Sequence, residues 1–116
     1  MPLVVSGDTR QDREDYSYVI YTKFNPVTKQ IYIGRSAGAG TPEQVAKRRD
    51  YQHTDLNKAG FGKAIVHSAL VNVGGAIGYP AMRGREQQVI DSYGGVGDPL
   101  VANKIRGGSQ KKAHNR

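Results

Sequence analysis

Four side chains of types that can act on a phosphate ester are spread along the sequence. Tyr21 and Tyr32 carry phenols, which need assistance to move a proton because a reference pKa of about 10 leaves roughly one phenol in a thousand ionised at pH 7. Arg49 offers a planar fork that matches the geometry of a phosphate. Glu86 offers the oxygen ligands that Mg²⁺ prefers. Together these types suit a reaction in which a phosphate is bound, neutralised and attacked.

Two strand-like segments carry the phenols. Residues 16–24 and 29–35 are rich in aromatic and β-branched residues, and residues 25–28 (NPVT) between them are typical of a type I turn. The pattern predicts a β-hairpin in which Tyr21 lies opposite Tyr32, so that the two phenols share one face. Proline fits a two-residue hairpin loop poorly, so a bulge that shifts this register by one is the alternative.

A helix is predicted to follow the hairpin, after a glycine-rich stretch at residues 34–40 that is expected to be flexible. Thr41 is a typical N-cap and Gln44 closes a capping box, so the helix is expected to run to about His53. Arg49 and His53 stand four residues apart and therefore project along the same stripe of this helix.

The second half of the chain shows weaker patterns. Residues 63–71 predict a second helix, the glycine-rich residues 73–79 a third strand, and residues 81–93 a third helix that is stopped by glycines 94 and 95. Glu86 then lies in the middle of the last helix. The whole pattern predicts an α+β fold, with a small three-stranded antiparallel sheet flanked by helices.

The charge of the chain favours a polyanionic partner. Lys and Arg number 17 against 10 Asp and Glu, which gives a net charge of +7 and a sequence pI near 9.8. A basic surface kept only for solubility explains the same composition equally well. The absence of cysteine excludes disulfide bonds and thiolate metal sites.

A single domain is expected for 116 residues. Residues 1–15 are interpreted as a leader or linker, residues 16–105 as the folded domain, and residues 106–116 as a basic tail. The apolar stretch near the start is too short for a secretory signal, and no segment is expected to span a membrane. Any export would therefore use another route, such as passage as part of a longer chain.

The segments around the two phenols resemble the paired motif of the GIY-YIG nucleases. Residues 19–21 (VIY) match the first half, with valine in place of the glycine, and residues 32–34 (YIG) match the second. The resemblance covers about residues 18–105 and implies the fold of that family. The further site residues that it implies follow in order along the chain: Arg35, Arg49, His53, Glu86 and Asn103.

The resemblance also implies an activity. It implies a metal-dependent endonuclease that hydrolyses phosphodiester bonds of DNA with low sequence specificity, and one Mg²⁺ (or Mn²⁺) ion held by Glu86. Tyr21 is then the base and Tyr32 its positioning partner. The alternative is that a metal-bound or tyrosine-oriented water is the nucleophile and the phenols only position it.

Further basic residues are expected to contact the phosphates of the nucleic acid, namely Arg35, Arg48, Lys104 and Arg106. Arg48 is also the alternative to Arg49 as the functional arginine. Arg49 is preferred because His53 stands one turn after it, whereas Gln52 is a poorer partner for Arg48.

The segment from residue 85 to residue 105 resembles the toxin modules at the C-terminal ends of bacterial polymorphic toxins. Such a module acts in the cytoplasm of a target cell and is paired with an immunity protein, which is expected to be acidic because this chain is basic. Two other classes stay open: a non-catalytic module that binds DNA, and a basic structural protein that prefers folded RNA.

Overall fold

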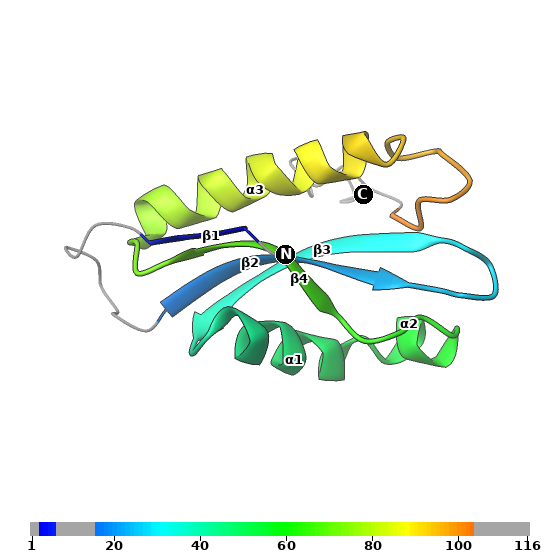
Figure 1. The fold of residues 1–116 in the computed structure, drawn as a ribbon, viewed down its shortest axis with the longest axis horizontal. Helices are drawn as coiled ribbons and strands as arrows, with labels where there is room; N and C mark the ends of the chain where they lie inside the picture. Colours follow the sequence, from blue (N-terminus) through cyan, green and yellow to red (C-terminus); the bar gives the residue numbers. More distant parts are fainter. Residues whose placement is uncertain (1–2, 7–15, 104–116) are drawn as a thin grey trace, which may run out of the picture.

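A computed structural model describes residues 3–6 and 16–103, and Lys104 and Arg106 lie outside the described residues. A single sheet forms the middle layer and helices cover both of its faces (Figure 1). The elements in chain order are β1 (Leu3–Ser6), β2 (Tyr16–Phe24), β3 (Ile31–Ala39), α1 (Pro42–Gln52), α2 (Thr54–Lys58), β4 (Ile65–Val71) and α3 (Gly75–Ser92).

The strand order in the sheet is β1-β4-β2-β3. Strand β2 is antiparallel to both of its neighbours, β4 and β3, so the predicted α+β class with a small three-stranded antiparallel sheet flanked by helices is confirmed. Strand β1 adds a fourth, parallel strand on the outer edge of β4. It lies within the stretch that was interpreted as a leader or linker.

The hairpin forms, but its predicted register is wrong by two residues. Tyr21 pairs with Gly34, and Tyr32 pairs with Lys23. The turn is longer than expected because the side-chain oxygen of Asn25 accepts hydrogen bonds from the two backbone N–H groups of residues 27 and 28, and Lys29 adopts a φ of 68°. Since side chains alternate with a period of two, both phenols still lie on the same face of the sheet.

Strand β3 also extends further than predicted. It continues to Ala39 through most of the stretch at residues 34–40 that was expected to be flexible. Helix α1 begins as predicted: Thr41 is the N-cap, its side chain accepts from the N–H of Gln44, and the Gln44 side chain bonds back to complete the capping box. The helix ends at Gln52, with His53 as its C-cap.

The predicted helix at residues 63–71 is wrong, because this segment forms β4. It lies between β2 and β1 in the sheet. A strand covered on both faces reads as a short apolar run, and periodicity alone does not separate such a run from a helix.

The predicted strand at residues 73–79 is also wrong, since α3 already begins at Gly75. Gly78 belongs to this first part of the helix, where a Cβ would lie 2.5 Å from the ring of Tyr18, so glycine lets the helix pack closely on the sheet. The predicted stop is confirmed, because Gly94 and Gly95 adopt φ angles of 114° and 84°.

Two apolar clusters lie on opposite faces of the sheet. Alternation along β2 sends Ile20 to the α3 face and Tyr21 to the α1 face. The α3 cluster includes Ile33, Met82, Val89 and Ile90, and the α1 cluster includes Val19, Val45, Ala46 and Val66. Among the residues described, no helix is long and apolar enough to cross a membrane.

Candidate active site

Tyr21 and His53 form the centre of the site. The Tyr21 side chain is only 1% exposed, and its hydroxyl lies 2.5 Å from Nε2 of His53. The hairpin fixes the phenol, and the end of α1 fixes the imidazole, because His53 is the C-cap of that helix. Two groups that can exchange a proton are therefore held in contact by two separate elements.

Gly34 determines how the phenol lies. It is the cross-strand partner of Tyr21, and a Cβ at this position would meet Cε1 of Tyr21 at 2.8 Å and meet Cζ and the hydroxyl oxygen more closely still. The phenol therefore lies flat across the backbone of β3 in space that any other residue would occupy. This contact gives a physical reason for glycine at the end of the YIG segment.

Tyr32 completes a cluster of three rings. Its ring centroid lies 5.4 Å from that of His53 in an edge-on arrangement and 6.5 Å from that of Tyr21. The two phenols meet diagonally across the strands rather than directly opposite each other, as the observed register requires. Both nevertheless lie beside the same imidazole.

Arg49, rather than Arg48, is directed to the phenols. A hydrogen bond from Arg49 and its positive charge both lower the pKa of Tyr21, although not enough to offset burial. Arg49 also donates to the side chain of Gln52 at 2.8 Å. Arg48 instead donates to the backbone carbonyl of Ala39 at the end of β3. Of the two arginines left open by the sequence, the geometry favours Arg49.

The proton on the Tyr21 hydroxyl is firmly held in the resting site. Burial raises the pKa of Tyr21 well above its usual range, and the neighbouring Tyr32 and Glu86 raise it further. Burial lowers the pKa of His53, and the charges of Arg49 and Lys23 lower it further. Both shifts favour the neutral forms of the two groups, and the tautomer of His53 decides which of them donates in the hydrogen bond.

Glu86 belongs to α3, which covers the face of the sheet opposite α1 (Figure 1). Its side chain is 7% exposed and lies 3.3 Å from Nε of Arg35 on β3. Burial raises the pKa of Glu86 to about 7, against the lowering effect of Arg35. The Glu86 charge also raises the pKa of Tyr21 and Tyr32, whose phenols lie on the α1 face of the sheet.

Asn103 holds the edge strand that carries these groups. Its side chain accepts from the N–H of Ile33 at 3.0 Å and donates to the carbonyl of Ile33 at 2.7 Å. Both ends of the amide are thus engaged with the backbone between Tyr32 and Gly34. The geometry supports a positioning role for Asn103, rather than the catalytic one that the resemblance implies.

Comparisons with known proteins identify no relative of this chain. No protein-family profile, curated protein or solved structure matches this chain.

Lys23 is the buried charge that sequence reasoning missed. It is fully buried, forms an ion pair with Asp50 and donates to the side chain of Asn57 at 2.7 Å. A buried charge is tolerated only when it is paired and hydrogen-bonded, and these contacts tie α1 and α2 to the sheet beneath His53. Lys23 stands two residues after Tyr21 in a predicted strand, and this spacing could have indicated that its side chain lies on the same face as the phenol.

The described residues contain no cluster of three or more His, Asp or Glu side chains that would enclose a metal ion. Glu86 offers a single carboxylate whose raised pKa reflects how little its surroundings stabilise the charge. Mg²⁺ commonly binds through one carboxylate, several waters and a substrate phosphate. The donor set therefore fits a metal that binds together with its substrate.

Proposed function

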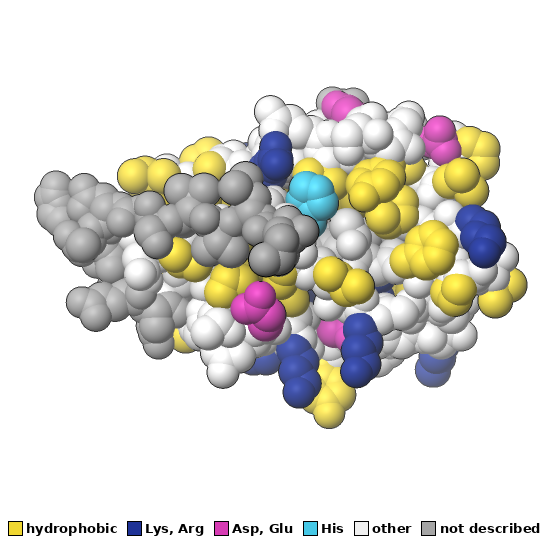
Figure 2. Space-filling view, in the orientation of Figure 1, with side chains coloured by type: hydrophobic (Ala, Val, Ile, Leu, Met, Phe, Trp, Pro, Cys, Tyr) yellow, Lys and Arg dark blue, Asp and Glu magenta, His cyan; other side chains and the backbone are white. Residues whose placement is uncertain are grey.

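We propose that this chain is a metal-dependent endonuclease that hydrolyses phosphodiester bonds of DNA. The observation that carries the proposal is the hydrogen bond between Tyr21 and His53, with the charges of Arg49 and Glu86 acting on that phenol. These groups supply a proton acceptor, a phosphate-binding cation and a metal ligand. The basic surface supports the same substrate, because Lys and Arg side chains gather over α1 along the lower edge of the face seen in Figure 2.

The hydrolytic step moves protons through the two central residues. A water gives a proton to the Tyr21 oxygen while Tyr21 passes its own proton to Nε2 of His53, so no free phenolate has to form. The water oxygen bonds to phosphorus as the bond to the leaving oxygen breaks. The leaving oxygen takes a proton from solvent, and His53 then returns the proton it received to solvent. Arg49 binds the non-bridging oxygens. A Mg²⁺ or Mn²⁺ ion held by Glu86 supplies further neutralisation of the phosphate charge when bound.

The direct test is a plasmid-nicking assay with the purified chain. Cutting is expected with Mg²⁺ and is expected to be lost with EDTA or in Glu86→Gln. A chain that bound the plasmid without cutting it would be the non-catalytic DNA-binding module instead. A chain that preferred folded RNA and left the plasmid intact would be the basic structural protein.

Removal of the Tyr21 hydroxyl is expected to lower the rate of cutting about 100-fold, which is typical for loss of an acid–base group. His53→Ala should cause a similar loss, and the Tyr21→Phe/His53→Ala double variant should be no slower than either single variant, because both belong to one proton path. Single-turnover rates at saturating DNA measure the effect. Tyr93→Phe, at an exposed tyrosine, is the matched control. Near-normal cutting by Tyr21→Phe would leave the phenol only a positioning role.

The two adjacent arginines are expected to differ. Arg49→Ala should reduce cutting at least about 100-fold by removing a phosphate contact that strengthens in the transition state. Arg48→Ala should cost only several-fold, since this side chain bonds to the backbone of Ala39. Arg83→Ala, an exposed arginine on α3, controls for the loss of one positive charge. A larger loss in Arg48→Ala than in Arg49→Ala would reverse the assignment.

The proposal includes an antibacterial role as a toxin module, acting in the cytoplasm of a target cell and neutralised by an acidic immunity protein. Its support is the resemblance of residues 85–105 to toxin modules and the net charge of +7. Expression of the wild-type chain in bacteria should stop growth and degrade chromosomal DNA, and expression of Glu86→Gln to the same level should not. Unaffected growth and intact chromosomes with the wild type would remove the toxin role while leaving the nuclease proposal to the plasmid assay.

A further inference from the structure

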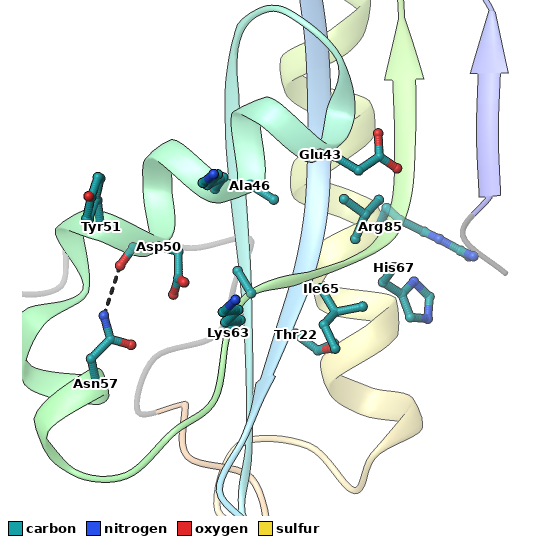
Figure 3. A pocket seen from close by; sticks show the side chains of 13 residues that line it. Thr22, Glu43, Ala46, Asp50, Tyr51, Asn57, Lys63, Ile65, His67 and Arg85 are labelled. Atoms are coloured by element: carbon teal, nitrogen blue, oxygen red, sulfur yellow. Dashed lines mark hydrogen bonds between the residues drawn. The ribbon is translucent and has the colours of Figure 1, made fainter.

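A groove separate from the phenols lies between α1, α2, the beginning of β4 and one side chain of α3. It has a volume of about 1030 Å³. Figure 3 shows Lys63 and Ile65 near the start of β4, Tyr51 from α1, and Arg85 from α3 on its walls. None of the phenols Tyr21 and Tyr32 or the carboxylate of Glu86 lines it, so the groove is not the proposed active site.

One side of the groove is an open strand edge. Strand β1 pairs with residues 68–71 of β4 and, within the described part of the chain, no strand pairs on that side with residues 65–67. The register with β2 shifts at the same place, because Ile20 pairs with Ser68 and Tyr21 pairs with Val66. An edge of this kind presents N–H and C=O groups in the spacing that an added strand can use.

The groove combines exposed apolar surface with an excess of positive charge. Ile65 is 65% exposed and Tyr51 is 82% exposed, and both line the same groove. The lining carries three cations and two acids, namely Lys47, Lys63 and Arg85 against Glu43 and Asp50.

The acids leave most of this positive charge unneutralised. Asp50 is already paired with the buried Lys23, which leaves Glu43 alone against the three cations of the lining. The Arg85 guanidinium is held by one long hydrogen bond of 3.3 Å to Gln88, and among the described residues its Nε–H has no acceptor. Among the described residues the Arg85 guanidinium forms no ion pair, so a negatively charged group in the groove would be its first acidic partner.

We propose that this groove binds an extended acidic segment of a protein partner, which adds a strand beside residues 65–67 of β4. Its carboxylates lie near Lys63 and Arg85, and its alternate apolar side chains cover Ile65 and Tyr51. Duplex DNA fits the groove less well, because phosphates do not pair with a strand edge or cover exposed apolar side chains. The inference goes beyond the proposed nuclease activity and does not depend on it.

Fluorescence anisotropy with the full chain and a labelled synthetic peptide that alternates valine and glutamate tests the proposal. The peptide should bind saturably, and Lys63→Glu and Arg85→Glu should each weaken binding about tenfold. Arg83→Glu, on the exposed side of α3, should leave the affinity unchanged. A peptide alternating proline and glutamate has the same charge but lacks half of the N–H donors, and it should bind at least about tenfold more weakly. Circular dichroism checks that the variants fold.

Hydrogen exchange supplies a second readout that identifies the place of binding. The bound valine–glutamate peptide should slow amide exchange at residues 65–67 more than elsewhere in the sheet. Equal affinity for the proline peptide, slowed exchange at another segment, or no binding would each overturn the proposal. Binding of a labelled DNA duplex, measured in EDTA, provides a further check. If Lys63→Glu weakened DNA binding more than it weakened peptide binding, the groove would be a nucleic-acid surface and the proposal would be wrong.

Discussion

Glu86→Gln is expected to abolish cutting and, at pH 8, to make the folded protein more stable. The carboxyl has a pKa of about 7 in the folded chain against 4.5 for the free group, so ionisation above pH 7 opposes folding. The stability that the protonated form contributes is complete below pH 4.5 and is lost as the pH rises through about 7. Glutamine keeps the shape of the side chain and never ionises, so it avoids this cost.

The size of the stability gain follows from the pKa. The rise from 4.5 to about 7, which already includes the lowering effect of Arg35, corresponds to at most about 3 kcal/mol. Because local relaxation and water reduce the cost of a buried charge, about 1–2 kcal/mol is the expected gain at pH 8. For a domain of this size that gain corresponds to a Tm higher by roughly 4–10 °C. At pH 5, where Glu86 is protonated in the folded chain, the two proteins should melt within about 2 °C of each other.

Thermal melts followed by circular dichroism at the two pH values measure this effect, alongside the plasmid assay. Asp91→Asn, at an exposed acid on the same helix, is the control and should show neither the pH-dependent gain nor the loss of cutting. A lower Tm for Glu86→Gln at pH 8 would mean that the ion pair with Arg35 outweighs the cost of burial. A stable variant that still cuts would end the role of Glu86 as metal ligand.

Residues that destabilise the folded protein but serve its activity are common in functional sites. A buried carboxylate with one partially exposed arginine beside it is unfavourable in the free protein. Under the proposed function, its ionised form would become favourable when a metal ion binds together with the substrate. The raised pKa of Glu86 is therefore more informative about function than about folding.

Local sequence signals predicted the parts of the fold that local interactions decide. The capping box at Thr41 is completed within four residues, and the stop after α3 needs only two glycines with positive φ. The prediction that Tyr21 and Tyr32 share one face of the sheet is also correct, because the observed register differs from the predicted one by an even number of residues.

Most of the wrong predictions concern segments whose structure is decided by residues far away in the sequence. Residues 65–71 form a strand because β2 and β1 pair with them on either side, and neither partner is adjacent in sequence. The hairpin register is the exception, because it depends on a local contact: the side chain of Asn25 accepts from the backbone N–H groups of residues 27 and 28 and lengthens the turn. β1 is only four residues long and obtains its hydrogen bonds from a strand more than sixty residues away.

In the candidate site too, some features could be predicted from the sequence and others depend on contacts between distant segments. The types and order of Tyr21, Arg49 and Glu86 can be predicted from the sequence, because each is a feature of its own segment. The bond between Tyr21 and His53 and the buried pairing of Lys23 depend on how α1 packs on the sheet. No spacing rule along the chain contains that information.

Gly34→Ala is the second change with a large expected effect, although it adds only a methyl group. The added Cβ would overlap the Tyr21 ring, and the ring has little room to retreat because it packs in the cluster of Val45 and Ala46 on the α1 face. We expect Tyr21 to lose its bond to His53 and cutting to fall at least about 100-fold. The overpacking should also cost about 1–3 kcal/mol of stability.

The matched control is Gly84→Ala, because a Cβ at this glycine of α3 meets nothing within 4 Å. Alanine there should leave cutting unchanged and stabilise the helix by up to about 1 kcal/mol. Single-turnover cutting and the chemical shift of the His53 ring report the two consequences of Gly34→Ala separately from its effect on Tm. Full activity in a folded Gly34→Ala protein would mean that the phenol does not have to lie across β3.

Combining Gly34→Ala with Tyr21→Phe separates catalysis from packing. Phenylalanine already lacks the hydroxyl that moves the proton, so the added methyl group should cause little further loss of cutting while still lowering the Tm. If the two substitutions instead reduced cutting independently, glycine would be required for something other than the position of Tyr21. In the double variant, the added methyl group is therefore expected to lower the Tm without a further loss of cutting. This difference makes the role of Gly34 testable even though both single variants are impaired.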